Sequence, residues 1–395
     1  VNAANTPFIT VALAYDPDTQ QMTGIRTTRA KDGQDLQNLV YWYDPVGNVT
    51  HIENKAQGAV PSLPEGVSLD QDYTYDALYR LTQSTGIALQ SLSLADAMGG
   101  VFNPFFASKA AANYTLGYTF DNGGNLCTTR FSAGANAWCA ELTVAPDSNR
   151  GAVLKTGESA TAVHTWFDDN GNQVKTPDDR PIQWNWHNQI ASINVGETVD
   201  NARAGADYFS YSGAAYRRRK TTVSGTAGNT QVEDQFDFGS LQVSCLTVEG
   251  QCSVQLRRTR HKHGNHLTFE RLEWSNAAPD TGLPTAQERY QLADMLGSAV
   301  MEVDGEGNLL TYEHYAANGA TLFATGQSTA QAELKRFRYS GEERDQTSGL
   351  YFYGARYLEP WTGRWLSPDP AGDIDGPNRY AFVGGNPASH IDIGG

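Results

Sequence analysis

One short phrase recurs along the chain and constrains its fold more than any other feature. Each copy places an aromatic residue before an aspartate, turns at glycine and asparagine or their substitutes, and continues into a run of alternating apolar and polar residues. Five copies are visible, the last with Val303 in the aromatic position: Tyr43–Ile52, Tyr75–Leu81, Phe120–Leu126, Phe167–Val174 and Val303–Leu309. A repeated unit of this kind cannot bury its own apolar face, so neighbouring units must stack or wind together.

Each copy has the pattern of a strand, a hairpin turn and a second strand. The aspartate side chain accepts hydrogen bonds from the backbone of the turn that it opens, and the Gly-Asn pair supplies the positive-φ residues of a tight hairpin. The alternation that follows is typical of a half-buried strand. We therefore expect Asp44, Asp76, Asp121 and Asp168 to form turns, and we predict an all-β fold.

The composition agrees with this prediction and excludes several classes of protein. Aromatic residues make up 11% of the chain and 39 residues are glycine, which suits pleated sheets joined by many turns. The formal net charge of −15 argues against a nucleic-acid partner. No apolar run is long enough to span a bilayer, so we expect no direct membrane span. No signal peptide is visible, and the first residue, Val1, suggests a fragment or a processed product.

The four cysteines form two pairs in sequence, Cys127 with Cys139 and Cys245 with Cys252. Each pair could face across a hairpin and form a disulfide, or all four could be free thiols in half-buried strands. Neither pair has the spacing of a zinc site. The sequence leaves the choice between disulfides and free thiols open.

The last 60 residues carry a dense series of motifs in which glycine, arginine, aromatic and aspartate residues recur at fixed spacing. The matching residues are Gly341, Glu343–Asp345, Gly349–Tyr351, Gly354–Tyr357, Pro360, Gly363–Trp365 and Ser367–Pro370. This series resembles the core that is associated with Rhs repeats. The Tyr-Asp units upstream likewise resemble the Rhs/YD-repeat family, in which strands spiral into a large hollow shell.

Further phrases resemble one branch of that family, the C subunits of insecticidal Tc (ABC) toxin complexes. They are Tyr73–Leu81 with Thr85 and Gly86, then Tyr118–Leu126, Asp147–Arg150, Tyr290–Gly297 and Ser367–Gly376. The resemblance implies a shell region at residues 1–335, closed by a core at residues 336–395. It also implies two partners: a B-type shell subunit, because this chain is too short to close a large cavity, and an encapsulated C-terminal toxin that is absent here. The implied location is secreted, as part of a bacterial toxin complex.

The resemblance implies a mechanism as well. Such cores act as aspartyl proteases that cut their own chain once, just after the core, with neither a cofactor nor a metal. The implied residues are Asp369 in the Asp-Pro motif, Asp392 in the place of a second such motif, and Asp375 between them. Two carboxylates that share one site are expected to hold one proton between them. The charged one would activate water, and the protonated one would donate to the scissile carbonyl.

An arginine of the core could bias the carboxylate pair or stabilise the oxyanion. Arg356 is the first candidate and Arg364 the second, with a structural ion pair as the alternative for both. We expect Asp345 to form a structural salt bridge or turn. Asp392 is followed by isoleucine where the family pattern has proline, which leaves the exact scissile bond open. The last residue, Gly395, lies about where a self-cleaved product would end, although a truncated chain would look the same.

The alternative function is a cell-surface adhesion or carbohydrate-binding module without cleavage. The aromatic runs Tyr41–Tyr43 and Trp184–Trp186 could form platforms for sugar rings, although strand packing is the commoner use. The histidines of His261–His266 could bind a metal or form a solvated hairpin tip. The basic run Arg217–Lys220 is expected to divide its side chains between the two faces of a strand.

Overall fold

The structure is a computed structural model that describes residues 8–61, 63–94, 110–194, 202–213, 216–226, 229–248, 251–275 and 282–395. Most of the described elements are strands, in two large antiparallel sheets, which confirms the all-β prediction. The first sheet has nine strands in sequence order: β1 (Ile9–Tyr15), β2 (Met22–Arg29), β3 (Asp35–Tyr43), β4 (Val49–Asn54), β5 (Gln71–Tyr75), β6 (Leu81–Leu89), β7 (Ala111–Phe120), β8 (Leu126–Ala133) and β9 (Asn136–Glu141).

The second sheet has twelve strands, also in sequence order. They are β12 (Ile182–Trp184), β13 (Ile190–Asn194), β14 (Ala202–Tyr211), β15 (Arg217–Thr226), β16 (Asn229–Asp237), β17 (Leu241–Val248), β18 (Gln251–His263), β19 (Leu267–Trp274), β20 (Ala286–Ala293), β21 (Ala299–Val303), β22 (Leu309–Tyr315) and β23 (Thr321–Gly326). Consecutive antiparallel strands can be joined by short hairpins, and the repeated turns form four of these connections: β3 to β4, β5 to β6, β7 to β8 and β21 to β22.

The remaining elements are short. A small sheet near the C-terminus contains β24 (Glu343–Arg344), β25 (Tyr351–Phe352), β26 (Tyr357–Glu359) and β27 (Arg364–Trp365), and β10 (Thr143–Val144) pairs with β11 (Gly151–Ala152). The described helices are η1 (Gln57–Ala59), η3 (Ala160–Trp166), α2 (Thr329–Glu333), η4 (Tyr339–Gly341) and η5 (Val383–Gly385). None of the helices within the described ranges is long and apolar enough to cross a membrane.

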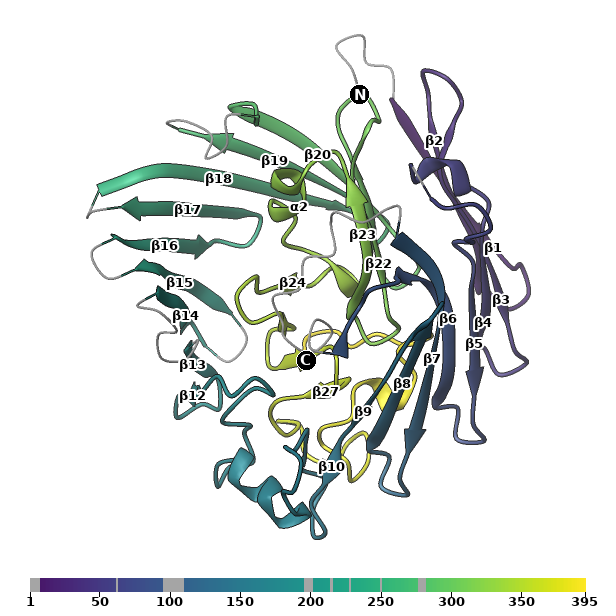
Figure 1. The fold of residues 1–395 in the computed structure, drawn as a ribbon. Helices are drawn as coiled ribbons and strands as arrows, with labels where there is room; N and C mark the ends of the chain where they lie inside the picture. Colours follow the sequence, from purple (N-terminus) through teal and green to yellow (C-terminus); the bar gives the residue numbers. More distant parts are fainter. Residues whose placement is uncertain are drawn as a thin grey trace.

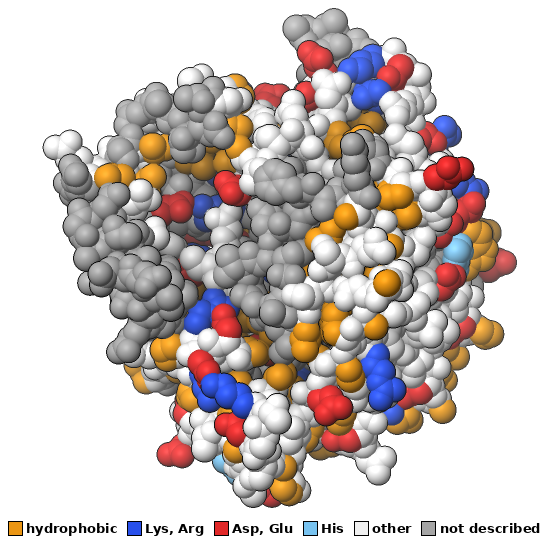
Figure 2. All heavy atoms as spheres, viewed as in Figure 1, with side chains coloured by type: hydrophobic (Ala, Val, Ile, Leu, Met, Phe, Trp, Pro, Cys, Tyr) orange, Lys and Arg blue, Asp and Glu red, His pale blue; other side chains and the backbone are white. Residues whose placement is uncertain are grey.

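The two large sheets form opposing walls, and the C-terminal segment lies between them (Figure 1). The first sheet stands at the right of the view, and the second runs from the left over the top to the centre, where β23 lies against β6. In the part of the chain that the structure describes, the sheets do not close into a barrel. The space-filling view shows a hollow beside the second sheet, with acidic and basic side chains visible inside it (Figure 2).

Apolar side chains from both walls share one core. Leu69 and Ile87 of the first half of the chain pack with Leu292, Val303 and Phe323 of the second sheet, and all five are almost fully buried. Burying such side chains stabilises the folded state by about 1.5–3 kcal/mol each. The two sheets are therefore one packed unit where β6 and β23 meet.

The C-terminal segment has its own core against the second sheet. Leu350 and Trp361 pack on Ile182, Ile190 and Phe209, which lie at the beginning of that sheet. A second cluster, made almost entirely of aromatic rings, joins the segment to Tyr315 of β22. Its other members are Tyr339, Tyr351, Tyr353, Leu358, Trp365 and Phe382. Both clusters therefore help to fix the position of the C-terminal segment.

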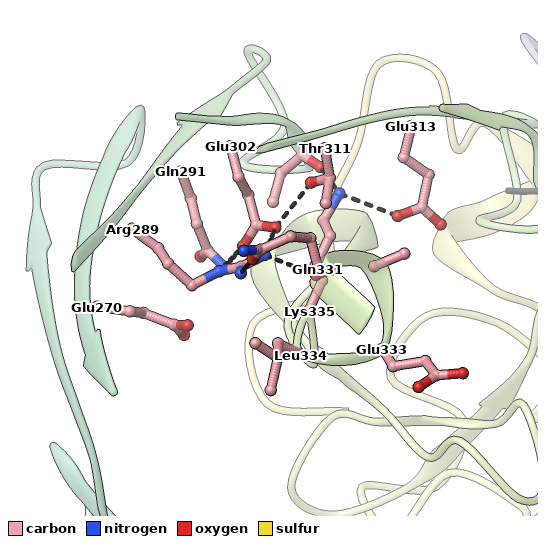
Figure 3. A network of polar contacts seen from close by, with 12 residues as sticks. Glu270, Arg289, Gln291, Glu302, Thr311, Glu313, Gln331, Glu333, Leu334 and Lys335 are labelled. Atoms are coloured by element: carbon pink, nitrogen blue, oxygen red, sulfur yellow. Dashed lines mark hydrogen bonds and ion pairs between the residues drawn. The ribbon is translucent and has the colours of Figure 1, made fainter. Parts of the chain in front are cut away.

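A buried network of charged groups fastens α2 and the residues after it to the second sheet (Figure 3). Arg289 of β20 pairs with Glu302 of β21 and donates to the carbonyl oxygen of Gln331 in α2 at 2.9 Å. Lys335 lies 2.9 Å from Glu313 of β22. Burial alone would raise the pKa of Glu302, but the charges of Arg289 and Lys335, together with hydrogen bonds from Arg289 and Gln291, lower this pKa to about 2. Buried charges persist only when paired in this way.

The repeated turns have the geometry of a type I turn closed by one left-handed residue. In the first copy the N–H of Asp44 donates to the carbonyl of Asn48, and Gly47, with φ of +95°, donates back to Asp44. The aspartate carboxylate accepts from two backbone N–H groups, those of Val46 and Asn48. The turns at Asp76, Asp121, Asp168 and Asp304 repeat both backbone bonds, which confirms the turn-forming aspartates.

The expectation that asparagine supplies a second positive φ is wrong. Only the fourth residue of each turn is left-handed. It is glycine in four copies (Gly47, Gly124, Gly171 and Gly307) and Tyr79, with φ of +63°, in the copy at Asp76–Arg80. The asparagine donates its side-chain amide to the carboxylate that opens the turn, as Asn48 does to Asp44 at 2.7 Å. The same backbone bonds recur in further turns whose sequences are more worn, among them Asn185–Gln189 and Asp294–Ser298.

The two cysteine pairs differ. Cys245 and Cys252 form a disulfide across the hairpin of β17 and β18. Cys127 and Cys139 are free thiols. Cys139 lies opposite Arg130 in the sheet, and the backbone of Cys127 bonds to that of Leu142, so the two thiols are out of register.

Candidate functional site

The small C-terminal sheet positions a cluster of one arginine and two aspartates. Arg356 precedes β26, Asp369 follows β27, and Asp392 lies near the end of the chain. The Nη2 atom of Arg356 is 3.0 Å from Oδ2 of Asp369 and 3.5 Å from Oδ2 of Asp392. Because both carboxylates contact one nitrogen, their Oδ2 atoms lie near each other at the same end of the guanidinium. The structure therefore brings together three of the five predicted site residues.

The guanidinium of Arg356 is held rigidly. Its side chain is only 5% exposed, and it lies over the indole ring of Trp365 with 4.3 Å between its Cζ and the ring centroid. Nη1 donates to the carbonyl oxygen of Arg379 at 3.2 Å, while Nε is buried without a hydrogen-bond partner. Burial lowers the pKa of Arg356, and the charges of Asp369 and Asp392 oppose that shift. A stacked arginine with a fixed plane suits the bridging of two carboxylates.

Backbone groups orient both carboxylates. Asp369 accepts from the N–H of Ala371 at 2.7 Å, and its own N–H donates to the carbonyl of Arg379 at 3.0 Å. Asp392 accepts from the N–H of Gly395 at 2.8 Å. These bonds leave the Oδ2 atoms of both aspartates directed at Arg356. The two carboxylates are partly accessible, with 13% of the Asp369 side chain and 23% of the Asp392 side chain exposed.

The backbone after Asp392 lies against the same site. The N–H of Ala355 donates to the carbonyl of Gly394 at 2.9 Å. Gly395 approaches so closely that a Cβ atom there would lie 2.8 Å from the backbone nitrogen of Arg356 and 3.2 Å from Tyr353. Only glycine fits this approach without displacing the turn. Peptide groups of the chain itself are thus placed beside the arginine and the carboxylate pair.

The other two predicted residues lie outside this cluster. Asp375 is exposed on the loop after Asp369, and no hydrogen bond or ion pair joins it to another described residue, although its charge acts on Arg356. Arg364 is buried, donates to the side chain of Asn125 at 2.9 Å and to the carbonyl of Asn149, and lies over the ring of Tyr380. Burial lowers its pKa to about 10.

Asp345 is a structural ion-pair residue, as expected. It accepts from Arg217 and from Lys220, both of β15, and all three side chains are buried. The neighbouring Arg218 and Arg219 are exposed, so the basic run divides between two faces as expected. A register shift between β14 and β15 near Arg217 lets residues three apart share the inner face.

The remaining candidate sites are not assembled. Trp186 is 85% exposed, but Trp184 is half-buried and donates its indole N–H to the carbonyl of Gln173, so the two rings do not form one platform. His266 is buried and bonds to the carbonyl of Asp294, whereas His261 and His263 are exposed. Over the described ranges, no three His, Cys, Asp or Glu side chains gather as metal ligands would.

The cluster contains the side chains that general acid–base chemistry uses. Two carboxylates at one site can exchange one proton, and a guanidinium that contacts both can stabilise developing negative charge. Sequence reasoning did not identify the support that Trp365 gives to Arg356, nor the role of the Arg379 carbonyl. Trp365 stands in the Gly363–Trp365 motif, but only the packing shows what its ring contacts.

No family model matches the chain. It is 30% identical to toxin subunit YenC1 of Yersinia entomophaga over 380 residues, which are 95% of this chain and 39% of that protein. It is 31% identical to toxin subunit YenC2 of the same organism over 413 residues, covering 98% of this chain and 40% of that protein. The chain thus spans about two fifths of the length of these relatives. It also matches the crystal structure of TcdB2-TccC3 with a TM-score of 0.90 and 31% identity, covering 98% of this chain and 18% of that chain.

Proposed function

The chain is a homologue of the toxin subunits YenC1 and YenC2 with the fold of part of the TcdB2-TccC3 complex, and on this premise we propose that it is the shell region of a Tc toxin C subunit. Residues 1–335 form part of the wall. Residues 336–395 form a core that cuts its own polypeptide once, by aspartyl chemistry, and so releases a C-terminal toxin into the shell.

The contact of Arg356 with both Asp369 and Asp392 carries this proposal. The three residues come from separate parts of the core, and they meet beside backbone of the same chain. The structural network of Arg217 also joins one arginine to two carboxylates, those of Glu343 and Asp345, but it buries both of them. A second carboxylate, partly accessible to water, is what hydrolysis by an aspartate pair requires.

In the proposed reaction the ionised carboxylate takes a proton from a water molecule as the water oxygen attacks the scissile carbonyl. Arg356 stabilises the negative charge that forms on the carbonyl oxygen. The C–N bond then breaks, and the protonated carboxylate gives its proton to the leaving nitrogen. One water is consumed and the pair again holds one proton. The roles of acid and base belong to the pair, not to either aspartate alone.

The bond that is cut lies on the C-terminal side of Asp392. The hydrogen bonds from Ala355 to Gly394 and from Gly395 to Asp392 hold that stretch at the site. We give Asp375 an accessory role through its charge. Arg364 has a structural role, because its guanidinium is engaged by Asn125 and Asn149.

The shell is completed by a B-type partner subunit. The strands of this chain form two walls that do not close in the described ranges, and the matched TcdB2-TccC3 chain is several times longer. A polypeptide confined within a closed wall cannot complete a compact fold or reach a target. Cleavage inside the shell would detach the cargo so that it can exit. Until it exits, the shell would still protect it.

The test is the mass of the product when the complete gene product, including whatever sequence follows Gly395, is expressed. We expect one clean cut C-terminal to Asp392, and we expect Asp369→Asn and Asp392→Asn each to abolish it. Asp373→Asn is the matched control, because Asp373 lies on the same loop and pairs with the side chain of Arg379. An uncut wild-type protein, or cleavage that survives in both aspartate variants, would contradict the proposal.

A further inference from the structure

The two aspartates of the site are joined by a stretch that lies along the repeat turns of the chain. We call residues 378–389 the bridging segment. It begins nine residues after Asp369 and ends three residues before Asp392. Within its short span it contacts turns that are up to 338 residues away in sequence.

The start of the bridging segment is fixed to the turn Asp121–Asn125. Asn378 donates its amide to the side-chain oxygen of Asn125 at 3.0 Å and to the carbonyl of Gly123 at 3.1 Å. Asn125 is 1% exposed, and its own amide is bonded to Asp121 at 2.9 Å. The anchor point is therefore part of the rigid turn rather than a mobile side chain.

The residue after Asn378, Arg379, connects this anchor to the site. The carbonyl oxygen of Arg379 accepts from the N–H of Asp369 at 3.0 Å and from Nη1 of Arg356 at 3.2 Å. A shift of Asn378 would move this carbonyl, and with it both the arginine and the first aspartate. The chain of contacts from Asn125 to Asp369 involves no flexible side chain except the two asparagine amides.

The end of the bridging segment is fixed to the turn Asp44–Asn48. Asn386 donates to the side-chain oxygen of Asn48 at 2.7 Å, and both residues are buried. The hydroxyl of Ser389 accepts from the N–H of Val49 at 2.9 Å. Asp392 follows three residues later, so its position is tied to a second repeat turn.

The middle of the segment contacts two more copies of the turn. Gly385 has φ of +81°, and a Cβ atom there would lie 3.2 Å from the ring of Phe120 and 3.3 Å from Arg80. The hydroxyl of Tyr380 donates to the carbonyl of Gly171 at 2.8 Å. Four of the five turns visible in the sequence therefore contact the segment. The turn at Asp304–Asn308 makes no hydrogen bond with it among the described residues.

We propose that Asn48 and Asn125 are positioning residues for the protease, so that the repeat turns of the wall set the separation of Asp369 and Asp392. This inference rests on the proposed autoproteolysis. Its consequence is an order of events: the site is completed only after the wall has folded, and the chain is cut only then. Displacement of a reacting group by about 1 Å can lower a rate roughly 100-fold, so loss of one anchor should be visible in the rate of cleavage.

The experiment compares self-cleavage rates of complete gene products that carry Asn48→Ala, Asn378→Ala or Asn308→Ala. The first two remove one anchor each, and we expect cleavage to slow at least tenfold. Asn308→Ala is the matched control, because it removes the same asparagine-to-aspartate bond from the turn that does not contact the segment. It should lose some resistance to urea, although less than Asn48→Ala, because Asn48 also accepts from buried Asn386. It should still cleave within about twofold of the wild-type rate.

A pH series separates positioning from general damage. In Asn378→Asp the carboxylate cannot donate to Asn125, but its protonated form can, and an aspartic acid gains that proton near pH 4. The ratio of variant to wild-type rate should rise several-fold between pH 7 and pH 4. A ratio that stays flat would overturn the inference, as would wild-type rates in Asn48→Ala and Asn378→Ala. An uncut wild-type chain would instead refute the proposed function, so the two failures are distinguishable.

Discussion

Arg217 donates to both carboxylate oxygens of Asp345 at 3.1 Å, although 128 residues separate them in sequence. Arg217 lies in β15 of the second sheet, and Asp345 follows β24 in the C-terminal segment. Both side chains are buried, and Arg217 also donates to Glu343 at 2.8 Å. This pair therefore fastens the core to the wall through charges that water cannot reach.

Removing one member of this pair should destabilise the protein strongly. We expect Arg217→Met to lower the free energy of unfolding by about 3–5 kcal/mol, because it leaves buried carboxylates without their main partner. Arg219→Met, which breaks the exposed pair with Asp234, should cost less than about 1 kcal/mol. Urea unfolding of both variants measures the difference, and equal losses would show that burial of the pair is not what matters.

Glu359 should make the stability depend on pH near neutrality. Burial raises the pKa of Glu359 from 4.5 to about 7, although Thr362 and Gln173 donate to its carboxyl group. Between pH 4.5 and 7 the folded state keeps a proton that the unfolded chain has lost. Stability should therefore fall as pH rises through this window, by roughly 3 kcal/mol, and level off above pH 7.

Glu359→Gln removes the titrating group, so its urea midpoint should lack this fall. The measurement is the difference in midpoint between variant and wild type at pH 5, 6, 7 and 8, which should grow in favour of the variant up to pH 7. Glu306→Gln, in the exposed turn at Asp304–Asn308, serves as the control. Parallel curves for wild type and Glu359→Gln would mean that Glu359 does not retain its proton.

Among the five copies of the repeat turn that are visible in the sequence, the copy at Asp76–Arg80 has Tyr79 at the left-handed position, where the other four have glycine. The φ of Tyr79 is +63°, and its ring is 52% exposed, so little packing offsets the backbone strain. We expect Tyr79→Gly to raise the free energy of unfolding by about 0.5–1 kcal/mol. Leu78→Gly, at the exposed neighbouring position, should lower it by a similar amount. A loss of stability in Tyr79→Gly would indicate that the ring makes a contact that outweighs the strain.

Arg356 should not be replaceable by lysine. A lysine keeps the charge but lacks the planar fork that reaches Asp369, Asp392 and the carbonyl of Arg379 together. We expect Arg356→Lys to slow self-cleavage about 100-fold and Arg356→Gln to abolish it. Arg379→Lys is the control, since the Arg379 side chain pairs with exposed Asp373 while its backbone serves the site. Full activity in Arg356→Lys would show that the site needs only a positive charge at this position and not the planar guanidinium.

The four cysteines should react with iodoacetamide in a fixed order. Without reductant, Cys139 is exposed and should be modified first, and Cys127 more slowly, because burial raises the pKa of its thiol. Cys245 and Cys252 should react only after reduction. Mass spectrometry of peptides checks the order, and labelling of Cys245 in the unreduced protein would contradict the disulfide.

Local chemistry accounts for the part of the fold that could be predicted from the sequence. The turn at Asp44–Asn48 follows from what a carboxylate, a glycine and an asparagine can do within five residues, and the alternating runs follow from the pleat. The same reasoning misassigned the asparagine, because its side chain and its backbone could each close the turn. It also missed the turn at Asp294–Ser298, where serine replaces asparagine and the backbone bonds persist.

For the candidate site, the motifs near the C-terminus were enough to select Asp369, Asp392 and two arginines as candidates. That Arg356 and not Arg364 contacts both carboxylates follows only from the tertiary structure, because both arginines are buried and only their partners differ. The tertiary structure also decided that distant turns hold the segment between the two aspartates. The separation of Asp369 from Asp392 is a property of packing across several hundred residues, and no local pattern encodes it.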